Sequence, residues 1–139
     1  MNHTDVLLLD ASVWVAAKDA GDAYFERART LAVSPGVPVA ALDLTFYEVA
    51  NALGKRRGHF EEALSICRLI KARSGGDLLK VDLGLIEAGL EVAADYGLTS
   101  YDAAYVAAAK RTGWTLVSTD IADLVSNGLA ITPDAADYP

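Results

Sequence analysis

The sequence predicts an α/β fold, a three-layer α/β/α sandwich with a mainly parallel central sheet. Short apolar runs alternate along the chain with segments of helical periodicity, which is the order that a parallel sheet requires. The first run, Val6 to Leu9, is continuous rather than alternating, as expected of a strand that is covered on both faces. Apolar residues make up 53% of the 139 residues, so we expect one domain, residues 1–139, with a large buried core.

The first half of the chain is predicted to hold two strands and four helices. After the strand at 6–9, Ser12 is placed to cap a short helix over 13–18. Apolar positions recur with helical spacing over 22–32, and Ser34-Pro35-Gly36 ends that helix. The remaining elements of this half are a strand at 37–42, a helix that starts at Asp43 or Thr45 and ends in a basic turn at 55–57, and a helix over 59–73.

The second half is predicted to repeat the alternation of strands and helices. Gly97 and Gly113 each end a helix, and Thr99 or Ser100 is placed to cap the helix that follows Gly97. The predicted elements are strands at 78–81, 115–117 and 129–131, and helices over 84–96, 101–111 and 121–125. The tail from Pro133 is expected to be loosely held.

Four acids lie in apolar surroundings. Asp10 follows "VLLL" and Asp120 follows "TLVST", so both are predicted at the carboxyl ends of strands, where open parallel sheets place their sites. Asp102 lies in the first turn of "TSYDAAYVAAA", and Glu48 lies in the apolar half of the helix that contains "TFYEVANAL". Because an unpartnered buried charge is costly, these positions require an explanation.

Three of the four acids also have a simpler interpretation. Asp102 would favour the positive end of a helix dipole, a gain of ~0.3–1 kcal/mol. Asp120 would cap a helix, and Glu48 would pair with a basic side chain. Asp10 has no obvious local partner. One metal site explains all four acids together.

Crowded carboxylates indicate which metal such a site would hold. They repel one another unless a cation is present, and hard oxygen ligands without His or Cys select Mg²⁺ or Mn²⁺. One or two such ions activate water and stabilise the leaving oxygen in phosphodiester cleavage. We therefore expect Asp10, Asp102 and Asp120 to bind Mg²⁺ and Glu48 to complete the site directly or through water.

Composition limits the other function classes. The formal net charge of −7 argues against nucleic acid as a partner, but less so if several acids hold cations. The single cysteine, Cys67, excludes an internal disulfide and fits a reducing cytosol. No apolar stretch approaches the ~20 residues of a membrane span, and no basic segment precedes the first apolar run. A cytoplasmic protein is expected.

Four segments carry a resemblance to a known family. "LLLDASVWVA", "TFYEVANAL", "TSYDAAYVAAAK" and "LVSTDIADL", in this order, resemble the acidic motifs of PIN-domain nucleases, and most of all the VapC toxins of bacterial type II toxin–antitoxin pairs. The resemblance spans Val6 to about Ile131 and implies a PIN-like sandwich. In chain order, the four family acids match Asp10, Glu48, Asp102 and Asp120.

Supporting positions follow from the same resemblance. Ser12 matches a small hydroxyl residue two positions after the first acid, and Ser118 stands where the family often has Thr. Asn51, one turn after Glu48, is common in the family and is placed to orient the site. Asp123 occupies a position that is acidic in only some members.

The resemblance also implies an activity and partners. It implies an endoribonuclease that depends on Mg²⁺ or Mn²⁺ and cleaves tRNA, rRNA or mRNA, forms a homodimer and is inhibited by a cognate antitoxin. From their place after the Glu48 helix, Lys55, Arg56 and Arg57 are candidate phosphate contacts. Alternatively, they merely complement the C-terminus of that helix.

Two rival functions remain at this point. A phosphohydrolase would use Asp10 as a covalent nucleophile, since a strand-end Asp suits that chemistry. Such enzymes often carry a second acid two residues later, where this chain has Ser12. The other rival is a non-catalytic PIN-like module that binds a partner or RNA, against which the complete set of acids argues.

Overall fold

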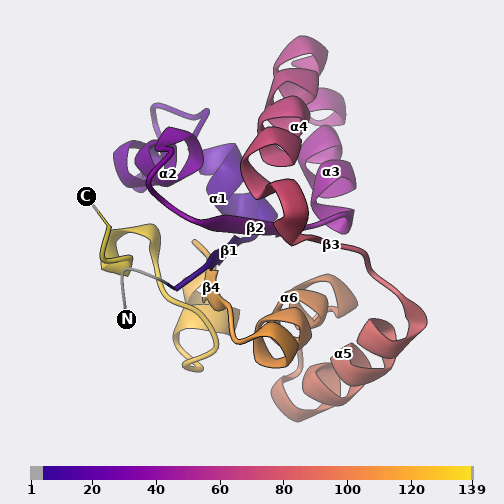
Figure 1. Ribbon diagram of the computed structural model, residues 1–139. Helices are drawn as coiled ribbons and strands as arrows, with labels where there is room; N and C mark the ends of the chain where they lie inside the picture. The colour runs from indigo at the N-terminus through magenta and orange to yellow at the C-terminus, as the bar shows by residue number, and fades with distance from the viewer. Residues whose placement is uncertain (1–4, 139) are drawn as a thin grey trace.

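Four short strands form one parallel sheet at the centre of the molecule (Figure 1), in a computed structural model that describes residues 5–138. The strands are β1 (Leu7–Leu9), β2 (Val39–Leu42), β3 (Leu78–Leu79) and β4 (Thr115–Val117), in the order β3-β2-β1-β4. All three pairings are parallel, and Leu8 of β1 lies between Ala40 and Leu116. The predicted strand at 129–131 is reduced to one parallel bridge between Ile131 and Val117.

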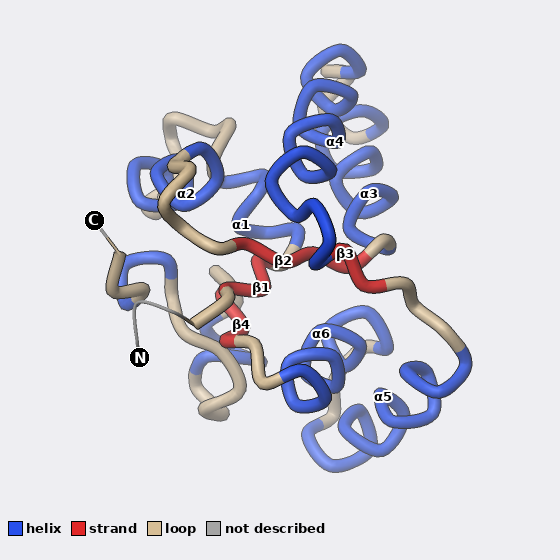
Figure 2. Tube along the Cα trace, in the orientation of Figure 1, coloured by secondary structure: helices blue, strands red, loops and turns tan. Residues whose placement is uncertain are grey.

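Helices cover both faces of the sheet, which confirms the predicted three layers (Figures 1 and 2). One face carries α1 (Ala11–Ala16), α2 (Phe25–Val33), α3 (Leu44–Val49) and α4 (Phe60–Ser74). The opposite face carries α5 (Leu83–Tyr96) and α6 (Ser100–Thr112). α3 continues into a π-helical turn, Ala50–Lys55, so the predicted helix through 55 is present but widens after Val49. The other short elements are a π-helical turn at Ile121–Val125 and 3₁₀ turns at Gly75–Asp77 and Pro133–Ala135.

The continuous apolar run of β1 is explained by its central place in the sheet. Leu7 and Leu9 pack into the core beneath α1, α2 and α4, whereas Leu8 packs into the core beneath α5 and α6. All three leucines are fully buried, and each contributes roughly 1.5–3 kcal/mol relative to an exposed side chain. Because successive side chains of a strand point to opposite faces, a strand covered on both faces needs an apolar residue at every position.

Three local expectations were wrong. Asp10 rather than Ser12 caps α1, which begins at Ala11 and ends at Ala16 instead of spanning 13–18. Phe25 begins α2 three residues later than predicted, because the Asp22 carboxylate accepts a hydrogen bond from the Tyr24 amide and forms a turn there. The tail after Pro133 is held in place: the Arg27 guanidinium donates to the carbonyls of Ala136 and Tyr138. The Tyr138 side chain is itself buried, and its hydroxyl donates to the Asp5 carbonyl.

Parallel pairing places the carboxyl ends of the strands at one edge of the sheet. Asp10 directly follows β1, Asp43 follows β2, and Ser118 to Asp120 follow β4. The predicted site acids at strand ends therefore meet at the same edge, next to the N-terminus of α6. Within residues 5–138, no helix is long and apolar enough to cross a membrane.

Candidate active site

Asp10 is held in the interior by hydrogen bonds. It is 5% exposed and caps α1, where its Oδ1 accepts from the Val13 amide at 3.3 Å and from the Ser12 hydroxyl. Burial raises the pKa of Asp10 to about 6, although the hydrogen bonds from Ser118, Ser12 and Val13 oppose that rise. The local partners that the sequence did not reveal are thus the hydroxyls and amide around the first turn of α1.

Two serines connect Asp10 to the loop after β4. The Ser12 Oγ accepts from the Thr119 amide at 3.0 Å and lies 3.5 Å from the Ser118 Oγ. Ser118 is fully buried, and its Oγ accepts from the Asp120 amide at 3.0 Å. The two predicted supporting hydroxyls therefore link the loops that carry the first and the last site acid.

Glu48 has a partner in the opposite helical layer. The Tyr105 hydroxyl of α6 donates to Glu48 Oε1 at 2.7 Å, and the Thr45 hydroxyl lies 2.6 Å from the same Tyr105 oxygen. Burial raises the pKa of the half-buried Glu48, the Tyr105 hydrogen bond lowers it, and the charges of Asp10 and Asp102 raise it further. No basic side chain among the described residues pairs with Glu48, so its simpler interpretation was wrong.

Asp102, Asp120 and Asp123 form a second, more open group of acids. One carboxylate oxygen from each lies within 4.8 Å of the others, and Asp102 and Asp120 are half-buried while Asp123 is exposed. Asp120 also caps the turn at 121–125 by accepting from the Asp123 amide at 3.0 Å. The capping interpretation and the clustering of acids therefore both hold for Asp120. Asp123, which the sequence left open, belongs to this group.

Electrostatic coupling joins the two groups into one site. Asp102 raises the pKa of both Asp10 and Glu48, and Asp10 raises that of Glu48. The pKa of Asp102 is raised first by burial and then by the charges of Asp120 and Asp123. Asp102, on the first turn of α6, is thus the acid that interacts with both sides of the site.

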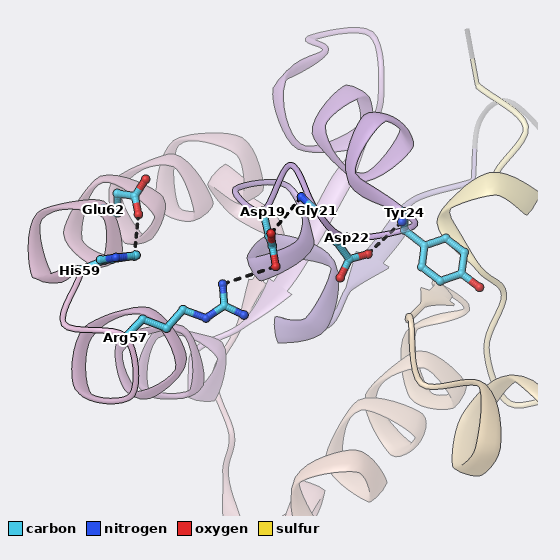
Figure 3. Close-up of polar contacts among 7 residues, drawn as sticks. All are labelled: Asp19, Gly21, Asp22, Tyr24, Arg57, His59 and Glu62. Atoms are coloured by element: carbon cyan, nitrogen blue, oxygen red, sulfur yellow. Dashed lines mark hydrogen bonds and ion pairs between the residues drawn. The ribbon is translucent and has the colours of Figure 1, made fainter.

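A cleft of about 770 Å³ opens beside these acids. Ser12, Glu48 and Asn51 line it together with Arg56 and Arg57, so the predicted supporting amide and two of the three predicted basic residues face the same space. Lys55 is exposed and does not line the cleft. Arg57 extends across to the loop after α1, where it pairs with Asp19 at 3.6 Å (Figure 3).

The donor set fits a hard divalent cation. The Asp102, Asp120 and Asp123 oxygens are close enough to share one ion, and no His or Cys belongs to that group within residues 5–138. Oxygen-only sets favour Mg²⁺ or Mn²⁺ over zinc. Burial is the main cause of the raised pKa values of Asp10, Glu48 and Asp102, and the charges of neighbouring acids add to it, so a bound cation would favour the charged form of all three.

Thr45 and Tyr105 are site residues that sequence reasoning missed. Thr45 was considered only as a helix start, and Tyr105 lay in an alanine-rich helix that was expected to be core. The one available signal was spacing: Tyr105 follows Asp102 by three residues, so the two side chains share a helix face. Nothing local indicated that this face reaches Glu48.

The PIN domain family model matches residues 7–123. Two curated relatives from Pyrobaculum aerophilum are each 36% identical. Ribonuclease VapC3 aligns over 125 residues, 82% of this chain and 88% of the relative. Exonuclease VapC9 aligns over 115 residues, 81% of this chain and 79% of the relative. A solved toxin-antitoxin complex from Klebsiella pneumoniae contains a chain with the same fold, with a TM-score of 0.66, 16% identity, and coverage of 91% of this chain and 97% of that one.

Proposed function

The chain belongs to the PIN-domain family, in its VapC-type branch, and on that premise we propose that it is a metal-dependent endoribonuclease that acts as the toxin of a toxin–antitoxin pair. The observation that carries the proposal is the meeting of acids from four elements at one sheet edge. Asp10 comes from the end of β1, Glu48 from α3, Asp102 from α6 and Asp120 from the loop after β4.

The site acids have different roles in binding the cation. Asp102, Asp120 and Asp123 lie close enough to bind one Mg²⁺ or Mn²⁺, and Asp10 and Glu48 complete the site directly or through water. When bound, the cation supplies Lewis-acid activation of water and neutralises charge on the phosphate. The hydrogen bonds of the Ser12 and Ser118 hydroxyls lower the pKa of Asp10, so they favour the charged form that binds a cation.

Basic side chains support RNA as the substrate. Arg56 and Arg57 line the cleft that Glu48 and Asn51 also line, so a phosphate backbone in the cleft would contact both cations and acids. The net charge of −7 is then compatible with RNA, because it includes the acids of the site, whose charge a bound metal would partly offset.

A cognate antitoxin and a second copy of the chain are the proposed partners. The structural relative from Klebsiella pneumoniae is a toxin-antitoxin complex, which supports an antitoxin. Exposed apolar side chains support self-association: Leu83, Ile86 and Leu90 recur along α5 and are 81%, 47% and 57% exposed. Light scattering of the purified chain, alone and with Leu83→Ser plus Leu90→Ser, would test the homodimer.

The activity is tested by cleavage of linear and circular RNA with Mg²⁺, with Mn²⁺ and with EDTA. We expect both RNAs to be cut when metal is present, since a circle has no end for an exonuclease, and neither to be cut in EDTA. Asp102→Asn should remove cleavage, whereas Asp95→Asn, an exposed acid on α5, should leave it unchanged. Cleavage by Asp102→Asn at the wild-type rate would overturn the assignment. Cleavage of the linear RNA alone would indicate an exoribonuclease instead of an endoribonuclease.

A covalent intermediate would give a different result. If Asp10 acted as a phosphohydrolase nucleophile, the protein would be trapped by fluoroberyllate at Asp10, and a phosphate monoester would be hydrolysed. We expect neither, because Asp10 is buried and its oxygen already accepts hydrogen bonds from Ser12 and Val13.

A further inference from the structure

We propose that Tyr105 is a positioning residue that holds the Glu48 carboxylate in the orientation needed for metal binding. The inference rests on the proposed metal-dependent nuclease and adds a residue to that site. Tyr105 would act through Glu48, without itself touching the metal or the RNA.

The hydrogen-bond directions around Tyr105 are fixed by chemistry. The phenol has one proton, and the carboxylate at 2.7 Å accepts it. The Thr45 hydroxyl, 2.6 Å from the phenol oxygen, must therefore be the donor in the second bond. Burial raises the pKa of Tyr105 well above its ordinary value, so the phenol keeps its proton. Thr45 thus donates a hydrogen bond to Tyr105, and Tyr105 donates one to Glu48.

The environment of the hydroxyl shows why these partners matter. Tyr105 is 1% exposed and Thr45 is fully buried, and Tyr105 packs in the apolar core under α5 and α6. A buried hydroxyl without a partner is destabilising, because it has lost its hydrogen bonds to water. The partners come from α3, on the opposite face of the sheet (Figure 1), so the bond passes from one helical layer to the other.

Glu48 needs such a donor more than the other acids do. Its side chain is long, half-buried and repelled by Asp10 and Asp102. Ordering a glutamate side chain costs rotamer entropy, because the side chain has several rotatable bonds. Asp102 and Tyr105 lie three residues apart on α6. The same helix therefore carries one site acid and the hydroxyl that orients another, Glu48.

The test is Mn²⁺ affinity at one fixed pH, measured by calorimetry on the full chain, together with RNA cleavage. Tyr105→Phe keeps the ring and removes the donor, and we expect up to about tenfold weaker Mn²⁺ affinity, no more than the loss of the Glu48 carboxylate itself would cause. The kcat for RNA should fall while the KM for RNA stays near wild type. The matched control is Tyr96→Phe on α5, an exposed ring that contacts Lys110, and it should bind Mn²⁺ as wild type does.

Two further variants separate positioning from packing. Thr45→Val should weaken Mn²⁺ binding in the same direction, and Thr45→Ser, which keeps the donor, should restore it. In a Glu48→Ala background, Tyr105→Phe should have no additional effect on Mn²⁺ affinity, because the group through which it acts is absent. A merely structural role would lower the melting temperature equally in both backgrounds.

The outcomes distinguish this inference from the proposed function. If Tyr105→Phe lowers the melting temperature yet binds Mn²⁺ as tightly as wild type, or if its effect persists undiminished in Glu48→Ala, the positioning role is overturned while the nuclease stands. If the wild-type protein binds no Mn²⁺ and cuts no RNA, the proposed function fails and the inference fails with it.

Discussion

The two groups of site acids are held in different ways. Asp10 is buried and Glu48 is half-buried, and each carboxylate accepts a hydrogen bond from a hydroxyl of the protein. Asp102, Asp120 and Asp123 lie nearer the surface and gather within 4.8 Å of one another. Hydrogen bonds of the protein therefore orient the two deep acids, Asp10 and Glu48, whereas the outer three, Asp102, Asp120 and Asp123, bring together the oxygens that a cation would share in the proposed site.

The largest difference should be in metal affinity. Asp102→Asn combined with Asp120→Asn removes two of the three clustered ligands, and we expect Mn²⁺ affinity to fall at least 1000-fold, roughly 4 kcal/mol. Glu48→Gln leaves the outer group intact and should cost on the order of tenfold. Calorimetric titration with Mn²⁺ measures both. Equal losses would show that the site is not divided into an outer and a deep part.

The next largest effect should be on the stability of the metal-free protein. Burial raises the pKa of Asp10 to about 6, against 3.8 for an exposed Asp, so its ionisation near neutral pH costs about 2–3 kcal/mol. Asp10→Asn should raise the free energy of unfolding in EDTA at pH 7 by up to that amount, because Asn retains an acceptor for Ser12 and Val13. Denaturant melts measure it, and a less stable variant would contradict the burial of charge.

The same residue sets a pH dependence. Between about pH 4 and pH 6 the folded protein holds a proton on Asp10 that the unfolded chain has lost, so stability in EDTA should fall as pH rises through this window. Glu48 and Asp102, whose pKa values are also raised, act in the same direction. Asp10→Asn should flatten the decline, and an unchanged slope in that variant would assign the decline to the other acids.

A smaller effect is expected from the hydroxyl that joins the two sides. Ser12→Ala removes the donor to Asp10 and the acceptor of the Thr119 amide, at a cost of about 1–2 kcal/mol in thermal or denaturant melts. Since the lost bond favours the charged carboxylate, Mn²⁺ affinity should also fall. Ser12→Thr, which keeps the hydroxyl, is the matched control, and equal behaviour of both variants would contradict the link.

The smallest effect should come from Arg56 and Arg57, the basic residues that line the cleft. Arg56→Ala should weaken RNA binding and reduce the slope of log affinity against log salt by about 1. Arg57→Ala should do less, because Asp19 already pairs with that guanidinium (Figure 3). Arg68→Ala, an exposed cation on α4, serves as the control. Identical slopes for all three would place the RNA outside the cleft.

The sequence by itself determined the order of strands and helices and the position of Asp10 and Asp120 after the ends of two strands. The continuous run of β1, the cap at Thr99, and the glycine stop at Gly97 are local signals, because burial on two faces and helix termination depend on neighbouring residues. The motif residues around Asp10, Glu48, Asp102 and Asp120 carried the family resemblance for the same reason, since each motif is contiguous in the chain.

Only the tertiary structure decided which groups meet. The hydroxyl of Tyr105 on Glu48, the inclusion of Asp123 with Asp102, and the anchoring of the tail by Arg27 all join elements far apart in the chain. Such contacts depend on how the elements on the two faces of the sheet are placed at the carboxyl ends of its strands. Residue periodicity predicts which face of a helix is buried, but it does not predict which residues that face contacts.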